Sequence, residues 1–207
     1  MDGIKTIIFD LGGVLVDLDV NKTIQSFAAL SGMPMDEIRH IYHTHQAMTA
    51  FEVGKIDDKT FREEVRNAIK LGDDVDDRKI DDAWNAMLLG IHKRKLDYVG
   101  TLKEQYNVFI LSNTNSIHID HVYSVILPKT AGVGSFQPFV HKTYYSYHMG
   151  MRKPDPVIYQ HVLNENGLTG AETIFVDDNL DNIRAAEEVG IRVRHVTDAE
   201  QVYQLTA

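Results

Sequence analysis

The spacing of apolar residues changes twice along this chain. Residues 5–9 form a short β-rich apolar run that ends at Asp10 and a glycine pair, which predicts a buried strand followed by a turn. Between residues 21 and 106 apolar side chains return at intervals of three and four positions, and aspartates stand near several helix starts as N-caps. No strand pattern of comparable strength occurs there. The expected helices cover residues 21–32, 35–48, 57–69 and 80–105.

Strand patterns return after residue 106 and alternate with helical ones. Strands that alternate with helices predict a parallel sheet with helices on both faces. We therefore expect an α/β fold with a doubly wound, Rossmann-like core. Residues 119–138 are poorly patterned and contain glycine and proline, so a loop with one short helix is expected there. The expected strands are residues 108–111, 139–145, 173–176 and 192–196, and the expected helices are 156–167 and 180–190.

The order of these elements predicts two parts. One strand comes first, a long helical stretch follows, and the rest of the sheet comes last. The helical stretch has its own apolar periodicity, so it is not a linker and is expected to form a small helical cap beside the sheet. We assign residues 1–16 and 107–207 to the α/β core domain and residues 17–106 to the cap. A chain of 207 residues is long enough to bury such a core.

The composition narrows the classes of function. Hydrophobic residues make up 43% and charged residues 25%, which is typical of a globular protein. The formal net charge is −9, and an acidic surface repels nucleic acid and anionic membranes. The absence of cysteine excludes disulfides, zinc–thiolate sites and thiol nucleophiles. The N-terminal segment lacks the pattern of a secretory signal and no apolar stretch is long enough to span a bilayer, so we expect a cytoplasmic protein.

Polar side chains follow three of the predicted strands at the point where each strand ends. These are Asp10, then Ser112 with Asn113, and then Asp177 with Asp178. Ligands bind at the carboxyl ends of the strands in open α/β sheets, so we expect these side chains to meet at one edge. Neighbouring carboxylates repel one another unless a cation joins them. Mg²⁺, which favours carboxylates, water and a substrate phosphate, meets this requirement.

Lys153 stands just before the predicted helix at 156–167 and adds a positive charge to this set. An ammonium group and the hydroxyl of Ser112 supply the donors that a phosphate needs. Phosphoryl transfer mainly requires positioning and neutralisation of charge. The remaining requirement is a nucleophile, and a carboxylate can serve by forming an aspartyl-phosphate. The residue types therefore indicate phosphoryl chemistry.

Four segments, in this order, resemble the motifs of the haloacid dehalogenase (HAD) superfamily. They are FDLGGVLVD at 9–17, LSNTN at 111–115, MRKP at 151–154 and FVDDNLDN at 175–182. Each segment alone is a weak signal, but all four in order at this spacing are specific. The helical insertion after the first segment resembles the cap of one large HAD branch. The likeness is strongest to bacterial sugar-1-phosphate phosphatases of the α-D-glucose-1-phosphate phosphatase type, and the phosphatase domain of soluble epoxide hydrolases is more distant.

The resemblance implies a role for each matching residue. Asp10 would attack phosphorus and also bind Mg²⁺, and the backbone carbonyl of Gly12 would be a further ligand of the metal. Lys153 would balance the charge of the nucleophile and the phosphate. Ser112 and the Asn113 backbone would hold the transferring phosphoryl oxygens. Asp177 and Asp178 would complete the metal shell, one directly and one through water, and we favour Asp178 as the direct ligand.

One position departs from the family pattern. Most family phosphatases have a second Asp two residues after the nucleophile as general acid and base, and here that residue is Gly12, which cannot exchange a proton. The acid then comes from Asp17, from a cap residue such as His43, or from water, or the leaving group needs little help. Trp84, at helical spacing with Met87, is expected in the cap core rather than as a sugar platform.

We expect a Mg²⁺-dependent phosphatase that acts on a small phosphorylated metabolite, an anomeric sugar phosphate first, through an aspartyl-phosphate. Two alternatives stay open. A metal-free haloacid dehalogenase also lacks the second Asp, although the acidic pair at 177–178 argues against it. The second alternative is a binding or regulatory protein that lost catalytic activity together with that Asp. The expected state is a monomer or weak homodimer, with no nucleic acid or membrane partner.

Overall fold

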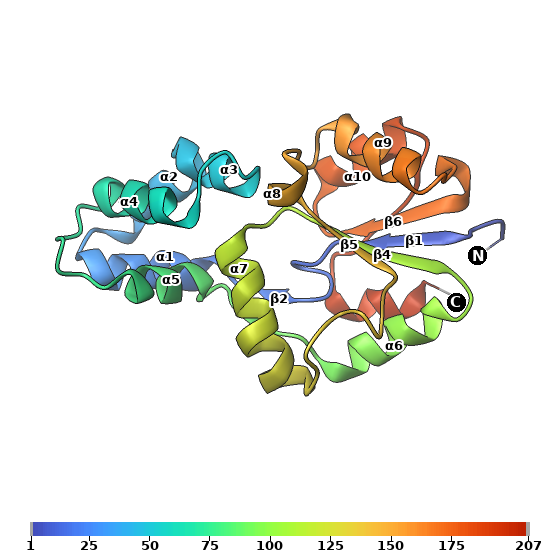
Figure 1. Ribbon diagram of the computed structural model, residues 1–207, viewed down its shortest axis with the longest axis horizontal. Coiled ribbons are helices and arrows are strands. Elements are labelled where there is room, and N and C mark those ends of the chain that lie inside the picture. The colour runs from blue at the N-terminus through green and yellow to red at the C-terminus, as the bar shows by residue number, and fades with distance from the viewer. Residues whose placement is uncertain (1, 206–207) are drawn as a thin grey trace.

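The strand that precedes Asp10 lies at the centre of a five-stranded parallel sheet (Figure 1). The computed structural model describes residues 2–205, and within them the strand order is β5-β4-β1-β6-β7. The order reverses its direction at β1, because β4 and β5 extend the sheet to one side and β6 and β7 to the other. The strands are β1 (Thr6–Phe9), β4 (Asn107–Ser112), β5 (Lys142–Tyr145), β6 (Thr173–Asp177) and β7 (Arg192–His195).

Helices cover both faces of this sheet, as the alternation of elements predicted. Side chains of β1 point alternately to two apolar clusters. Ile7 and Phe9 join the cluster under α6 and the π-helix η1, whereas Ile8 joins the cluster under α9 and α10. The doubly wound α/β fold is therefore confirmed. The helices of the sheet domain are α6 (Lys93–Lys103), α7 (Ser116–His121), η1 (Val122–Ala131), α8 (Ser146–Met149), α9 (Pro156–Glu165), η2 (Gly170–Glu172), α10 (Leu180–Glu188) and η3 (Ala199–Gln204).

The cap is a bundle of short helices that lies beside the carboxyl ends of the strands (Figure 1). Asp19, Asp57 and Asp76 cap three of these helices by accepting backbone hydrogen bonds, in line with the aspartates seen near the predicted starts. Apolar faces of the helices form a third cluster around Phe61 and Trp84, so Trp84 belongs to the cap core as expected. The helices are α1 (Val20–Ser31), α2 (Met35–Thr44), α3 (Gln46–Glu52), α4 (Asp58–Ala68) and α5 (Asp77–Asn85).

The helix expected over residues 80–105 is in fact two helices separated by a strand. β3 (Leu88–Gly90) pairs antiparallel with β2 (Asp17–Leu18), and Gly90 takes a φ of +152° that few other residues tolerate. After this interruption, the apolar side chains of α6 pack in the cluster of the sheet, not in that of the cap. We therefore propose that the cap ends near residue 87, before the predicted limit of 106.

The poorly patterned stretch at 119–138 is largely helical, which corrects the expected loop. α7 runs directly into η1, a π-helix that ends where Gly132 N–H donates to the carbonyl of Leu127. Ile126 and Leu127 face the sheet cluster, and this burial outweighs the helix-breaking tendency of Pro128. The strand expected from residue 139 begins at Lys142. None of the helices in the described residues is long and apolar enough to cross a membrane.

Candidate active site

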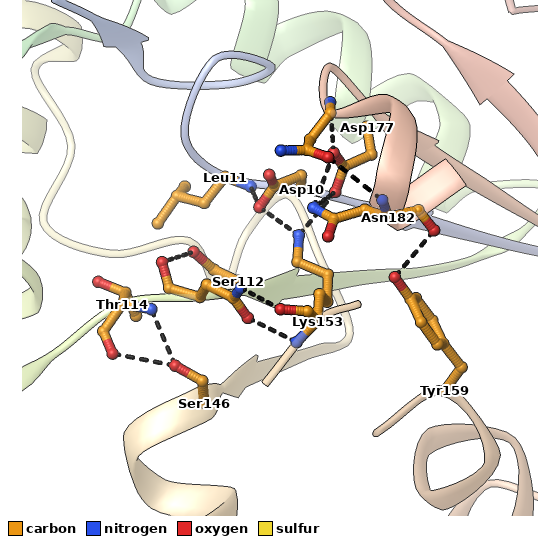
Figure 2. Close-up of polar contacts among 11 residues, drawn as sticks. Asp10, Leu11, Ser112, Thr114, Ser146, Lys153, Tyr159, Asp177 and Asn182 are labelled. Carbon is orange, nitrogen blue, oxygen red and sulfur yellow. Dashed lines mark hydrogen bonds and ion pairs between the residues drawn. The ribbon is translucent and has the colours of Figure 1, made fainter. Parts of the chain in front are cut away.

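The residues singled out by sequence meet at the carboxyl ends of the central strands (Figure 2). Asp10 follows β1 directly, Ser112 ends β4, and Asp177 ends β6. Lys153 comes from the loop before α9 and extends its side chain between the two aspartates. The predicted convergence is therefore observed, although more than 140 residues separate Asp10 from Lys153 in the sequence.

Lys153 is the buried cation of the site. Its Nζ lies 2.8 Å from Asp10 Oδ1 and 2.7 Å from Asp177 Oδ2, and only 1% of the residue is exposed. Burial acts to lower the pKa of the ammonium, but the two carboxylates outweigh it and the net pKa lies above its ordinary value. Lys153 therefore remains charged across the physiological range of pH and offsets the negative charge around it.

Asp177 is fixed by hydrogen bonds on both carboxylate oxygens. The backbone N–H of Asn179 donates to Oδ1 over 2.7 Å, and the Asn182 amide donates to Oδ1 and Oδ2 over 3.1 Å each. The Asn182 carbonyl in turn accepts the hydroxyl of Tyr159 (Figure 2). Together with the ion pair to Lys153, these contacts make Asp177 an anchor that holds the ammonium in place.

Asp10 keeps one carboxylate oxygen available. Both its ion pair with Lys153 and the 2.6 Å hydrogen bond from the Leu11 N–H involve Oδ1, and within residues 2–205 Oδ2 accepts no hydrogen bond. Burial raises the pKa of Asp10 to about 7, with Lys153 acting against it and Asp177 adding to it. The contacts to Oδ1 fix the carboxylate, while Oδ2 makes no hydrogen bond within the described residues and is therefore suited to nucleophilic attack.

The three carboxylates form a donor set that fits a hard divalent cation. Ligand oxygens of Asp10, Asp177 and Asp178 all lie within 4.8 Å of one another. Burial, followed by repulsion from Asp177, raises the pKa of Asp178, and a bound cation would relieve this repulsion. Asp178 as a whole residue is exposed whereas Asp10 and Asp177 are buried, but its carboxylate lies close to the backbone of Gly13.

Gly13 lets the loop after β1 approach Asp178. A Cβ at this position would lie 2.2 Å from Asp178 Oδ2, and the residue has a φ of +78°. Both the close approach and the left-handed backbone require glycine. The glycine pair after the first strand thus shapes the metal-binding side of the site.

The side chain of Asn113 holds the backbone of Lys153. Its amide Nδ2 donates to the Lys153 carbonyl and its Oδ1 accepts the Lys153 N–H, each over 2.8 Å. This reciprocal pair fixes the backbone of Lys153 and leaves only the Asn113 backbone to serve a phosphate. Ser112 is buried, and within residues 2–205 its hydroxyl donates a single hydrogen bond, to the Asn113 carbonyl over 3.5 Å.

A cavity of about 150 Å³ lies between the cap and the sheet, beside these residues. Gly12, Ser112 and Asn113 line it from the sheet side. Two of the lining residues of the cap side, Tyr42 and Glu52, were not predicted from the sequence, because a glutamate or tyrosine on a surface helix has no pattern that marks it. From the cap side and from α7 the cavity is lined by Tyr42, Glu52, Trp84 and His118, among others.

The two residues proposed from sequence as proton donors lie elsewhere. Asp17 is paired with the buried Lys95 at 3.1 Å and with His92 at 3.6 Å. His43 is exposed on α2 and does not line the cavity. Neither is therefore placed to give a proton to a substrate in this structure.

Comparison with known proteins agrees with this geometry. The model of the haloacid dehalogenase-like hydrolase family matches residues 4–190. The D-ribitol-5-phosphate phosphatase of Bacteroides thetaiotaomicron is 32% identical over 90% of this chain and 89% of its own length. A crystal structure of a HAD-family enzyme from the same organism, in complex with magnesium and inorganic phosphate, is 35% identical, with a TM-score of 0.84 over 93% of each chain.

A further solved structure, of a predicted HAD-like hydrolase from Porphyromonas gingivalis, superposes with a TM-score of 0.83. It is 30% identical, and the alignment covers 93% of this chain and 90% of that one. The family match spans both the sheet domain and the cap, which confirms the resemblance read from the four sequence segments. The chain belongs to the haloacid dehalogenase-like hydrolases.

Proposed function

We propose that this hydrolase is a Mg²⁺-dependent phosphatase that cleaves a small sugar or sugar-alcohol phosphate through an aspartyl-phosphate on Asp10. The observation that carries the proposal is the arrangement of Lys153 between Asp10 and Asp177, with Asp178 beside them. Such a site concentrates the charges that a phosphoryl group requires. The D-ribitol-5-phosphate phosphatase of Bacteroides supports this class of substrate, and the small cavity favours a leaving group of a few carbons.

Each residue then has a task in the reaction. Oδ2 of Asp10 attacks phosphorus while Lys153 neutralises charge on the nucleophile and on the transferring group. The Ser112 hydroxyl and the Asn113 backbone bind phosphoryl oxygens. Asp10, Asp178 and the Gly12 carbonyl would hold Mg²⁺ directly, and Asp177 would support it, since its own oxygens are already engaged. When bound, the metal supplies positive charge against the phosphate.

The two alternatives differ from this proposal in what they require. A metal-free dehalogenase has no use for three carboxylates that converge within 4.8 Å, so the acidic cluster weighs against it. A binding protein without chemistry has no use for an open Asp10 oxygen next to a buried ammonium. The phosphatase uses both features.

The test is a phosphate-release screen over sugar and sugar-alcohol phosphates, with Mg²⁺ and with EDTA. We expect release that depends on Mg²⁺ and that falls by at least about 10³-fold in Asp10→Asn, since the amide is a poor nucleophile. Turnover of a 2-haloacid in EDTA would support the dehalogenase instead. Wild-type turnover in Asp10→Asn would show that the nucleophile is another residue.

A further inference from the structure

The site as described lacks a proton donor for the leaving oxygen. An alkoxide is a poor leaving group, and the usual position for an acid is occupied by Gly12. We propose that Glu52, from the cap, is the general acid and base of this enzyme. The inference rests on the proposed phosphatase function and adds a catalytic residue to it.

Glu52 reaches the site because its backbone is docked on the sheet domain. It is the last residue of α3 and lines the same cavity as Gly12 and Ser112. Its carbonyl accepts the Ser146 hydroxyl over 2.6 Å, and the Ser146 oxygen also accepts the Thr114 N–H over 2.9 Å. One serine therefore joins the end of α3 to the segment that follows β4.

A close backbone contact strengthens this docking. A Cβ on Gly54 would lie 2.2 Å from the carbonyl oxygen of Tyr147, so the turn after α3 sits directly against α8. Gly54 also has a φ of +67°. The position of Glu52 relative to the sheet is therefore set by two independent contacts.

The carboxyl group is oriented by an ion pair. Arg152 donates toward Glu52 Oε2 over 3.0 Å, and Arg152 directly precedes Lys153. No hydrogen bond within residues 2–205 engages Oε1. A carboxylic acid can accept from the guanidinium through Oε2 while Oε1 carries the proton, so this pairing is compatible with donation into the cavity.

The charged and titratable neighbours of Glu52 are Arg152, Lys153 and Tyr42. Burial raises the pKa of Glu52, and the positive charges of Arg152 and Lys153 reduce that rise without cancelling it. A raised pKa suits a carboxyl that alternates between acid and base near neutral pH.

The other titratable side chains that line the cavity are unsuitable. Burial raises the pKa of Tyr42 to about 12, so it does not act as a base near neutral pH. Burial lowers the pKa of His118 to about 3, and its Nδ1 is engaged with Asn85 Oδ1 at 2.8 Å. Glu52 is the one carboxyl among the lining residues.

The proposed cycle balances protons and bonds. In the first step Asp10 Oδ2 forms a bond to phosphorus, the bond from phosphorus to the leaving oxygen breaks, and protonated Glu52 gives its proton to that oxygen. In the second step the Glu52 carboxylate takes a proton from water, and the water oxygen bonds to phosphorus. The bond to Asp10 then breaks, which releases phosphate and restores both carboxyl groups.

Leaving-group dependence tests the proposal, with Glu52→Gln as the variant. Ethyl phosphate needs a proton on its leaving oxygen, whereas acetyl phosphate, of similar size, expels acetate without one. We expect kcat/KM, which reports the steps up to release of the leaving group, to fall by about 10²–10³-fold in the variant for ethyl phosphate and for the best sugar phosphate. The kcat/KM for acetyl phosphate should stay within about threefold of wild type, whereas its kcat should fall because the second step has lost its base. Glu63→Gln, on the exposed face of α4, is the matched control and should change neither.

Three results would overturn the assignment. Equal losses of kcat/KM on ethyl and acetyl phosphate would mean that Glu52 only supports the structure, and unchanged kcat/KM and kcat on both would mean that it is not used. A loss on the sugar phosphate without a loss on ethyl phosphate would make Glu52 a hydroxyl-binding residue. Failure of the proposed function looks different, because the wild type itself would then release no phosphate from any of these esters.

Discussion

At the scale of single residues, Gly13 shows how a side chain that is absent shapes the metal site. In Gly13→Ala, the added methyl group must displace the Asp178 carboxylate, which would otherwise lie 2.2 Å away. We expect the Mg²⁺ concentration for half-maximal activity to rise by about 10–100-fold, the usual effect of disturbing a ligand's support. Titration of phosphate release with Mg²⁺ measures this.

Gly132→Ala is the matched control, because Gly132 also has a positive φ, of +69°, but nothing lies within 4 Å of its Cβ position. It should carry the same backbone strain without the clash. If the two variants shift the Mg²⁺ requirement equally, the close approach to Asp178 is not what matters.

His118 predicts a dependence of stability on pH. It is buried against Trp84, with ring centroids 4.8 Å apart, and its pKa is lowered from 6.5 to about 3. The unfolded chain takes up a proton near pH 6.5 and the folded chain does not until about pH 3, so unfolding binds a proton in between. Stability therefore falls as the pH drops below about 6.5.

Between pH 7 and pH 5 this group should cost about 2 kcal/mol of unfolding free energy. Urea unfolding of wild type and His118→Gln at both pH values isolates the effect, since glutamine has no proton to bind. The variant should lose less stability on acidification by about that amount. Parallel pH dependence in the two proteins would show that His118 already carries a proton in the folded state.

Residues of the site were predictable where chemistry and position in the sequence coincide. Asp10, Asp177 and Asp178 each follow an apolar strand, so sheet topology alone brings them together. Glu52 and Arg152 meet only because the cap folds back on the sheet, a contact between surfaces that no local pattern encodes. The sequence thus showed that Gly12 replaces the usual general acid, but it did not show that Glu52 could take over this role.

At the scale of elements, a buried threonine joins two cap helices. Thr23, on α1, donates its hydroxyl to the Trp84 carbonyl over 2.9 Å and accepts the Met87 N–H over 3.1 Å, at the end of α5. Thr23→Val keeps the shape but leaves both backbone groups without a partner. We expect a loss of about 2–4 kcal/mol in unfolding free energy, measured by urea denaturation.

Thr23→Ser keeps the hydroxyl and removes only a methyl group, so its loss should be about 1 kcal/mol. Similar losses in the two variants would assign the effect to packing. A larger loss of stability in Thr23→Val than in Thr23→Ser, which we expect, would assign the effect to the two hydrogen bonds at the end of α5.

Helices and strands were predictable from the sequence where burial makes apolar residues recur at one constant spacing over several helical turns or strand residues. The strands that end at Ser112 and Asp177 were found within a residue or two because both of their faces are apolar. β2 and β3 have only two and three residues, so β3 was hidden inside an apolar helical pattern. The π-helix η1 has a period that differs from that of an α-helix, and Pro128 suggested a loop.

At the scale of the whole molecule, the cap and the sheet have separate apolar cores. The cap cluster surrounds Phe61, which stacks on Phe51 with ring centroids 4.2 Å apart and lies 5.0 Å from Trp84. Ile117 is the sole buried member of that cluster from the sheet domain among the described residues. The carboxylates of the metal site, in contrast, all come from the ends of sheet strands. The two parts should therefore differ in how they respond to a core mutation.

Phe61→Ala tests this separation. Removing a fully buried phenyl ring costs about 3–5 kcal/mol, and the loss falls on the cap because its cluster is distinct from those of the sheet. Hydrogen exchange should accelerate in residues 20–86 while β1, β4 and β6 keep their protection, and Mg²⁺ should still protect the strand ends around Asp10. Phe109→Ala, on β4, should instead expose the sheet. Exchange that rises uniformly in Phe61→Ala would mean that the two cores unfold as one cooperative unit, and catalysis could then not rely on a cap that opens independently.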